Sequence, residues 1–309
     1  MSKSLAVCCR LFAVGAFLGV LAGCSTMRPE DEDPSTYKVL TIGNVFSISV
    51  LRHLPIVARE AGRDLDLASL FLRENSASNH WANALRDGED DRAFRPYRFD
   101  RIVKGVRKVS GARRNIGEVL RTTKWNAVVI QHDSSGKRTS GEDREAAVRL
   151  VACIRKFAPQ ADVLLQEPWS GTPWDPRLKE LNVDQGRMYE ELHASCRDFA
   201  DSQRVKVIPV GAAVQAWRRR LPVKYAENSF GGDVVGGGRL EARDHFERTL
   251  DNTWIPNGDV VSLNLKGEYL QSLVWACVLG MDLSDLKYRP ACVTEGEAEL
   301  MADIARGVR

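Results

Sequence analysis

Residues 39 to 49 read VLTIGNVFSIS, an apolar run that stops at a Gly-Asn pair. The apolar run from 39 to 42 predicts a buried strand, and Gly43 with Asn44 predicts a tight turn before a helix that begins near Ser47. The first backbone N–H groups of such a helix point into the cleft at the carboxyl edge of the sheet, where they favour negative charge. A nucleophilic serine therefore suits the position after the turn, but that position holds Val45.

Short apolar runs alternate with amphipathic helical patterns from residue 37 onward, which favours a parallel sheet between two layers of helices. Each run is apolar enough to be buried on both faces. We therefore predict an α/β fold, a three-layer sandwich whose central parallel sheet has about five strands. The predicted strands are Lys38–Ile42, Leu67–Leu72, Ala127–Gln131, Asp162–Gln166 and Val205–Val210. The predicted helices are Ser49–Ala61, Asn115–Thr122, Glu142–Phe157, Gln185–Asp201, Ala212–Arg220 and Lys266–Leu279.

Two segments interrupt this alternation. The charged stretch Asp87–Lys108 is expected to be an exposed excursion or a hairpin. The stretch Lys224–Asn257 contains FGGDVVGGGRL and is too rich in glycine for regular structure, so we expect a long loop near the carboxyl edge of the sheet. Ligands bind at that edge in open α/β sheets. We predict one domain over residues 37–281, with an extension over 282–309 that packs on its outside and holds a last helix near Glu295–Arg306.

The first 23 residues predict an export signal, because Lys3 and Arg10 lie before or within an apolar stretch that is too short to span a bilayer. Its end, Leu-Ala-Gly-Cys24, resembles the bacterial lipobox, in which the cysteine is acylated; the alternative is an ordinary cleaved signal. Acylation would anchor Cys24 to a membrane, and residues 24–36 would be a flexible tether. Because Ser25 follows, the resemblance to lipoproteins implies the outer membrane, facing the periplasm or the surface.

The charge balance argues against nucleic acid as a partner. The chain has 44 basic and 41 acidic side chains, a formal charge of +3. Loss of Lys3 and Arg10 with the signal leaves 44 − 2 = 42 basic residues, so the mature chain is nearly neutral and steering by charge is not expected. The spacing of cysteines and histidines suggests no metal, and we expect no cofactor. Beyond the signal and the anchor four cysteines remain, and either a Cys277–Cys292 disulfide or buried thiols fit the sequence; the others are Cys153 and Cys196.

Five sequence blocks, in order, resemble the SGNH (GDSL-type) hydrolase superfamily, and within it a branch that begins with Gly-Asn-Ser-Phe-Ser. The blocks in this chain are GNVFS (43–47), NSASNHW (75–81), WNAVVIQ (125–131), VIPVGAAVQ (207–215) and DVVSLNLKGEYL (259–270). The resemblance implies an SGNH hydrolase-like, flavodoxin-like fold and ester hydrolysis. It also implies that residues of these blocks line the cleft, namely Asn44, Val45, Asn75, Ser76, His80, Trp81, Gln131, Ser262 and Asn264.

The catalytic triad of the family is incomplete in this chain. The resemblance implies a nucleophilic serine at position 45 and an Asp and a His three residues apart in the last block. The chain retains Asp259 but has Val45 and Ser262 at the other two positions. A valine offers no hydroxyl, and loss of either the serine or the histidine of such a triad costs about 10⁶ in turnover. We therefore expect an ordinary serine mechanism to be absent.

Substitute groups lie nearby in the sequence. Ser47 follows two positions later, although a hydroxyl there also suits the first turn of a helix as a cap. His132, just after the third predicted strand, is the best replacement base. Trp169 and Trp174 are placed to stack on a sugar or to cover the core, and we favour the core.

We thus interpret the chain as an envelope lipoprotein, a catalytically degenerate relative of esterases that binds a carbohydrate or acylated glycan. The alternative is an active serine ester hydrolase of the carbohydrate esterase type that uses Ser47 and His132. A purely structural envelope lipoprotein is a third interpretation.

Overall fold

The computed structural model describes residues 33, 35–72, 76–88, 94–132, 141–171, 175–220, 246–248, 254–256 and 262–308. Pro34–Arg309 forms one compact unit, and Met1–Asp33 is assigned to another. The predicted signal peptide, Cys24 and most of the predicted tether lie outside the described residues. All described strands and helices belong to Pro34–Arg309, so this unit contains a complete sheet and its own cores and can be studied as a folding domain.

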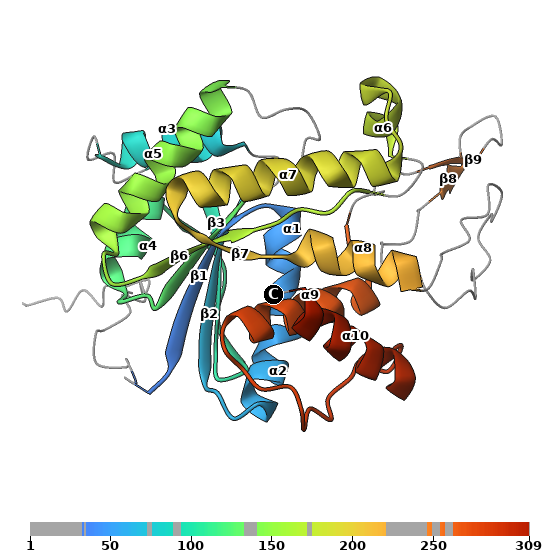
Figure 1. The fold of residues 1–309 in the computed structure, drawn as a ribbon. Coiled ribbons are helices and arrows are strands. Elements are labelled where there is room, and N and C mark those ends of the chain that lie inside the picture. Colours follow the sequence, from blue (N-terminus) through green and yellow to red (C-terminus); the bar gives the residue numbers. More distant parts are fainter. Residues whose placement is uncertain are drawn as a thin grey trace, which may run out of the picture. The chain divides into compact units, whose positions relative to one another are not determined.

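A central sheet of seven described strands runs in the order β4-β3-β2-β1-β5-β6-β7. Figure 1 shows this sheet between helices on its two faces. The strands are β1 (Tyr37–Gly43), β2 (Leu65–Phe71), β3 (Tyr97–Val103), β4 (Val106–Arg114), β5 (Ala127–Gln131), β6 (Asp162–Gln166) and β7 (Lys206–Ile208). Five of them are parallel, and among themselves they follow the flavodoxin-like order 2-1-3-4-5. The predicted α/β class and the five parallel strands are confirmed. We call the edge where these five strands begin the amino edge and the edge where they end the carboxyl edge.

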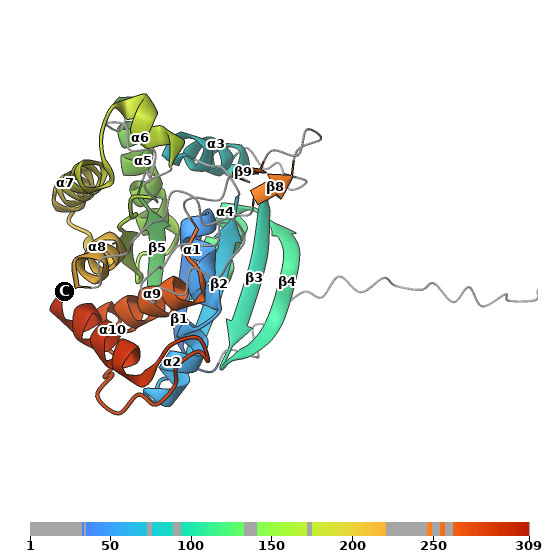
Figure 2. The ribbon, with the colours of Figure 1, turned by 90° about the vertical axis from the view of Figure 1, so that its right-hand side faces the viewer.

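Two antiparallel strands extend the sheet beyond β2 (Figure 2). They begin in the charged stretch Asp87–Lys108, for which the sequence predicted either an exposed excursion or a hairpin. The structure shows a hairpin, and it continues to Arg114. Lys104 and Gly105 form its turn with φ values of 51° and 78°. Positive φ at both central residues is what a two-residue hairpin loop requires. The Lys-Gly pair between Val103 and Val106 was the local signal for this turn.

Helices cover both faces of the sheet, as the sequence predicts. One face carries α1 (Val45–Ile48), the 3-10 helix η2 (Ser49–Leu51), α2 (Leu54–Glu60), α8 (Val210–Arg220), α9 (Leu265–Val278) and α10 (Glu295–Gly307). The other carries α3 (Ala77–Gly88), α4 (Ile116–Thr122), α5 (Gly141–Phe157) and α7 (Gln185–Gln203). A separate apolar core fills the space on each face, because side chains of a strand alternate between its two sides. Leu40 and Val128, for example, are paired on β1 and β5 and are fully buried in the same core.

The structure differs from the predicted elements in a few places. The predicted helix at 49–61 is interrupted: η2 ends at Leu51, and α2 begins after His53 with Pro55 in its first turn, where proline is tolerated. The helices α3 and α6 (Pro176–Leu181) were not predicted. The stretch Lys224–Asn257 was expected to lack regular structure, but it contains the antiparallel strands β8 (Phe246–Arg248) and β9 (Trp254–Pro256). The rest of that stretch lies outside the described residues.

The C-terminal extension packs through α10, which buries Met301 and Ile304 in the core shared with α8 and α9. A capping box between Thr294 and Glu297 begins this helix. The four cysteines left open by the sequence all lie in the described part of the chain, and no disulfide joins any two of them. Burial raises the pKa of the Cys196 thiol. Every helix in the described ranges is too short or too polar to cross a membrane.

Candidate functional site

The turn after β1 is built by two of the predicted cleft residues. Asn44 is the N-cap of α1, and its side-chain oxygen accepts the backbone N–H of Phe46 at 3.0 Å. Gln131 ends β5, and its Oε1 accepts the backbone N–H of Asn44 at 3.4 Å. The ends of the two adjacent strands are therefore joined at the carboxyl edge, and Val45 is the first residue of α1, directly after this turn.

Ser47 is buried and serves the turn itself. Its Oγ donates a hydrogen bond to the backbone oxygen of Asn44 at 3.0 Å, and its side chain is 1% exposed. A Cβ added to Gly43 would lie 2.5 Å from this Oγ, so the hydroxyl fits against the bare backbone of the turn. No histidine within the described ranges makes a hydrogen bond with Ser47. The hydroxyl therefore stabilises the first turn of α1, and the structure does not bring it together with His132.

His132 contacts a different serine. Its backbone N–H donates to the oxygen of Gln166 at 3.1 Å, which fixes it at the end of β5 beside β6. Its ring packs edge-on against Phe199, with centroids 5.9 Å apart. The Nε2 atom lies 3.4 Å from Ser195 Oγ in the middle of α7. The histidine that the sequence singles out as a substitute base is thus next to a hydroxyl, but to one that sequence reasoning did not name.

His80 shares a small cavity with His132. The cavity has a volume of about 30 Å³, room for one or two waters, and lies between the carboxyl edge and the helices α3, α5 and α7. His80 Nδ1 lies 2.8 Å from the Tyr97 hydroxyl, and the two rings are stacked. Burial lowers the pKa of His80 to about 4, so its ring is neutral near neutral pH. The polar side chains of the wall are His80, Gln131, His132, Asp143 and Arg144.

The remaining predicted cleft residues divide between α3 and α9. Ser76 precedes α3, and its Oγ accepts the backbone N–H of Asn79 at 3.4 Å. Trp81 is half-buried on the same helix. Asn264 is the N-cap of α9, and its Oδ1 accepts the N–H groups of Lys266 and Gly267 at 3.0 and 3.1 Å. Ser262 is half-buried two residues earlier.

Asn75 and Asp259 lie outside the described residues, as does Trp174. Trp169 is 1% exposed, and its ring centroid lies 4.4 Å from that of Phe46. It covers the core, as we favoured from the sequence.

Sequence reasoning missed a buried network behind α1, which we call the amide lock and define as Gln166, Gln271 and Trp275. The backbone oxygen of Phe46 accepts Nε2 of Gln166 at 2.6 Å and Nε2 of Gln271 at 2.7 Å. Oε1 of Gln166 accepts Nε2 of Gln271 at 3.1 Å and the indole N–H of Trp275 at 2.8 Å. Because all three side chains are fully buried, these hydrogen bonds are shielded from water. The lock joins β6, α9 and α1, and it fixes the backbone that follows Val45.

A second buried group holds the loop after β6. Glu167 is fully buried; one carboxylate oxygen contacts His193 Nδ1, and the other accepts the backbone N–H of Ala212 at 2.8 Å. Gly211 permits this approach of α8, because a Cβ there would lie 2.1 Å from the backbone oxygen of Pro168. The glycine of the fourth sequence block is therefore required by packing.

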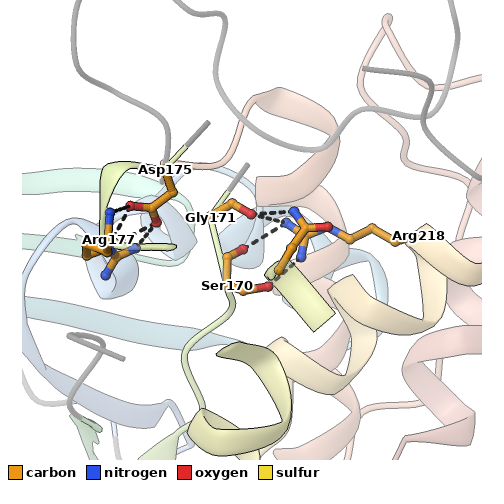
Figure 3. A network of polar contacts seen from close by, with 6 residues as sticks. Ser170, Gly171, Asp175, Arg177 and Arg218 are labelled. Carbon is orange, nitrogen blue, oxygen red and sulfur yellow. Dashed lines mark hydrogen bonds and ion pairs between the residues drawn. The ribbon is translucent and has the colours of Figure 1, made fainter. Parts of the chain in front are cut away.

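Arg218 fixes the same loop from the other end of α8 (Figure 3). Its guanidinium donates to Ser170 Oγ at 2.9 Å, to the Ser170 backbone oxygen at 2.8 Å and to the Gly171 oxygen at 3.3 Å. Farther along the loop Arg177 donates to the carboxylate of Asp175, which is the N-cap of α6. Buried charged donors of this kind hold backbone oxygens firmly. The loop that borders the carboxyl edge is thus fixed at several points.

The described residues contain no cluster of three or more His, Cys, Asp or Glu side chains that could hold a metal ion. The arrangement at the carboxyl edge is a well-supported turn with neutral or hydrogen-bonded polar groups around it.

No protein-family model matches the chain, and no curated protein matches it. Among solved structures, a DUF4886 family protein from Bacteroides uniformis aligns with a TM-score of 0.68 and 20% identity over 88% of this chain and 94% of that one. A candidate SGNH hydrolase from Slackia heliotrinireducens aligns with a TM-score of 0.47 and 17% identity over 79% and 100%. The acetylxylan esterase Axe2 from Geobacillus stearothermophilus aligns with a TM-score of 0.47 and 12% identity over 82% and 98%.

The first of these alignments shows that the chain shares its fold with a DUF4886 family protein, in agreement with the α/β sheet and strand order described above. At these identities the likeness is one of fold alone.

Proposed function

We propose that this chain is an exported lipoprotein whose SGNH hydrolase-like domain binds a carbohydrate or acylated glycan and does not hydrolyse it. One observation carries the proposal: the first residue of α1 is a valine, while the turn before it and the amide lock behind it are complete. This turn and network would support a nucleophile at position 45, and the valine there has no hydroxyl. Membrane attachment would occur through acylated Cys24, in the outer membrane facing the periplasm or the surface.

The nearest hydroxyl does not supply the missing group. Ser47 Oγ donates to Asn44 O, and no imidazole within the described part of the chain accepts its proton. A serine becomes nucleophilic near neutral pH only when a base takes that proton. Ser262 occupies the family's histidine position, so the base is lacking there as well. These features support binding rather than turnover.

The test compares residues 34–309 with the same domain carrying both Val45→Ser and Ser262→His. We expect hydrolysis of p-nitrophenyl acetate at the buffer rate for the wild type and a clear gain for the double variant, because the turn and the amide lock are already in place. Each single variant is the matched control and should stay near background, since a serine and its base act as a unit. Equal, substantial activity in wild type and double variant would overturn the proposal.

Binding is tested separately with an oligosaccharide in acetylated and deacetylated form, by calorimetry on wild-type residues 34–309. We expect heat of binding for the acetylated form that is reduced by Gln131→Leu, since Gln131 lies at both the turn and the cavity. Gln203→Leu, a substitution on the far end of α7, is the matched control. A panel of glycans that all give no binding, together with no turnover, would instead favour a purely structural lipoprotein.

A second candidate function, ester hydrolysis with relocated groups, is favoured by one contact: His132 Nε2 lies 3.4 Å from Ser195 Oγ. Such a pair has the elements of a nucleophile and a base. Ser195 lies inside α7, however, where backbone N–H groups are used within the helix and do not form an oxyanion hole. If wild type hydrolyses the ester and Ser195→Ala abolishes the activity while Ser47→Ala retains it, this function replaces the first.

A further inference from the structure

The amino edge of the sheet differs from the rest of the surface in its charge. Parallel strands begin there, α4 and α5 end there, and the β3–β4 hairpin turns there. Six exposed basic side chains from these elements form what we call the basic edge. They are Lys104, Arg107, Lys108, Arg121, Lys124 and Lys156. The net charge of the whole chain is close to zero and does not reveal this local group of basic side chains.

Few carboxylates compensate for the basic edge. Asp64 pairs with Lys104 at 2.7 Å, and buried Asp100 pairs with Arg107 at 3.1 Å. Asp162 at the start of β6 and exposed Glu60 at the end of α2 are two further carboxylates at this edge. Within the described ranges Lys108, Lys124 and Lys156 form no ion pair. Six basic against these four acidic side chains leave the described part of the edge with a net positive charge.

Apolar groups lie among these cations. Val106, the first residue of β4, is 56% exposed and is one of only three large apolar side chains that are exposed among the described residues. The Phe157 ring, half-buried at the end of α5, has the Arg121 guanidinium 4.8 Å and the Lys156 ammonium 5.5 Å from its centroid. Cations mixed with exposed apolar groups are suited to a phospholipid surface, where the charge meets phosphate and the apolar group meets the headgroup boundary.

The N-terminal segment also leaves the domain at this edge. Tyr37, the first residue of β1, donates its backbone N–H to the oxygen of Asp64 at 2.9 Å, beside the start of β2. Thirteen residue steps separate Tyr37 from Cys24 (37 − 24 = 13). A chain of that length spans at most about 45 Å when fully extended. An anchor at Cys24 therefore keeps the basic edge within reach of the bilayer that holds it.

We propose that the basic edge docks on anionic phospholipid of the membrane that carries the Cys24 anchor. This inference depends on the proposed export and acylation, which place the domain at a membrane. The docking surface itself comes from the structure. Docking at the amino edge turns the carboxyl edge, with the turn at Asn44 and the cavity at His80, away from the bilayer.

The experiment measures sedimentation of residues 34–309, which lack the anchor, with vesicles of phosphatidylcholine alone or mixed with phosphatidylglycerol. We expect binding only to the anionic vesicles, weakened by salt because screening shortens the range of surface charge. The triple variant Lys108→Ala, Lys124→Ala and Lys156→Ala should bind about a hundredfold more weakly, since each basic residue near an anionic surface contributes about fivefold.

The matched control removes the same charge elsewhere, by Arg149→Ala, Lys179→Ala and Arg187→Ala on α5, α6 and α7. It should retain binding within about threefold. Equal binding to both kinds of vesicle, or equal loss in the two triple variants, would overturn the docking proposal. Acylation is checked independently by mass spectrometry of the N-terminal peptide of the exported full chain, so a missing anchor and a missing surface give different results.

Discussion

The two sides of α1 show opposite use of polar groups. Behind the helix, the amide lock gives the Phe46 oxygen two buried donors, and Trp275 completes the network. In front of it, the first helical residue is a valine, and the nearby Ser47 hydroxyl is bonded back to Asn44. The backbone of α1 is therefore fixed by hydrogen bonds that do not involve the side chain of Val45, so the residue at position 45 can differ without loss of these bonds.

The largest loss of stability is expected for Gly211→Ala, which disturbs the contact between α8 and the loop after β6. The new Cβ would lie 2.1 Å from the Pro168 oxygen, a backbone atom that cannot move aside without shifting the loop. We expect a loss of about 3 kcal/mol in the free energy of unfolding, measured with urea, because α8 must separate from β6. Gly141→Ala is the control, since its Cβ would meet nothing within 4 Å and the change should be within about 0.5 kcal/mol. A small loss at Gly211 would mean that the loop after β6 is not fixed.

The next effect is a pH dependence of stability that comes from His80, which lines the small cavity. The pKa of His80 is lowered to about 4 in the folded state, below its ordinary value of 6.5, so the unfolded chain takes up the proton first. Stability should be full above about pH 6.5 and fall toward pH 4, by about 3 kcal/mol from this residue.

His80→Gln should flatten that decline in urea unfolding series. His53, with a pKa also lowered to about 4 by burial, contributes in the same direction and remains as an internal reference. A variant whose slope equals that of the wild type would show that His80 titrates normally.

Gln271→Leu removes two hydrogen bonds of the amide lock and leaves Asn44 and Ser47 unchanged. Ser49 Oγ, which donates to Gln271 Oε1 at 2.6 Å, loses its partner, and the Phe46 oxygen keeps only Gln166. We expect a loss of about 1.5 kcal/mol in unfolding free energy. Gln203→Leu, whose amide contacts only the exposed Ser202 side chain, should change it by less than about 0.5 kcal/mol. Identical effects of the two variants would contradict the role of the lock.

The smallest effect is expected for Ser47→Ala on the front side. The Asn44 oxygen keeps the backbone N–H groups of Ser47 and Ile48, so the loss should be about 0.5 kcal/mol. Esterase activity, where any is measured, should not change. A wild-type activity that disappears in Ser47→Ala would restore Ser47 as a nucleophile and contradict its role as a hydroxyl that only stabilises the first turn of α1.

The parallel core was predictable because each of its strands is a local apolar run bounded by turn residues. Asn44 and Gln131 were named through the family resemblance, and they meet because one follows β1 and the other ends β5 at the same edge of the sheet. The partner of His132 was not predictable, because Ser195 lies 63 residues away and only the packing of α7 on β5 joins them. The amide lock had a partial signal, since the strand DVLLQ ends in Gln166, but its connection to Gln271 spans 105 residues.

The many charged residues of β3 and β4 made these two strands hard to predict from the sequence. Five arginines and one lysine on an edge strand and its neighbour look like a solvated loop, yet an exposed edge strand is where charged residues protect a sheet from pairing with other chains. They are Arg98, Arg101, Arg107, Lys108, Arg113 and Arg114. Only Arg101 is buried, against Asp66 of β2.

The length of β1 sets the distance between the amino edge of the sheet and the turn at Asn44. Its seven residues rise about 3.3 Å each, so about 23 Å separates the end of the domain where the chain enters from the turn at Asn44. If the domain docks on the membrane through its amino edge, the turn at Asn44 lies at one fixed distance from the lipid headgroups. If only an extended tether holds the domain, that distance varies over tens of ångströms. The two arrangements sample different layers of an envelope, and so would meet different polymers there.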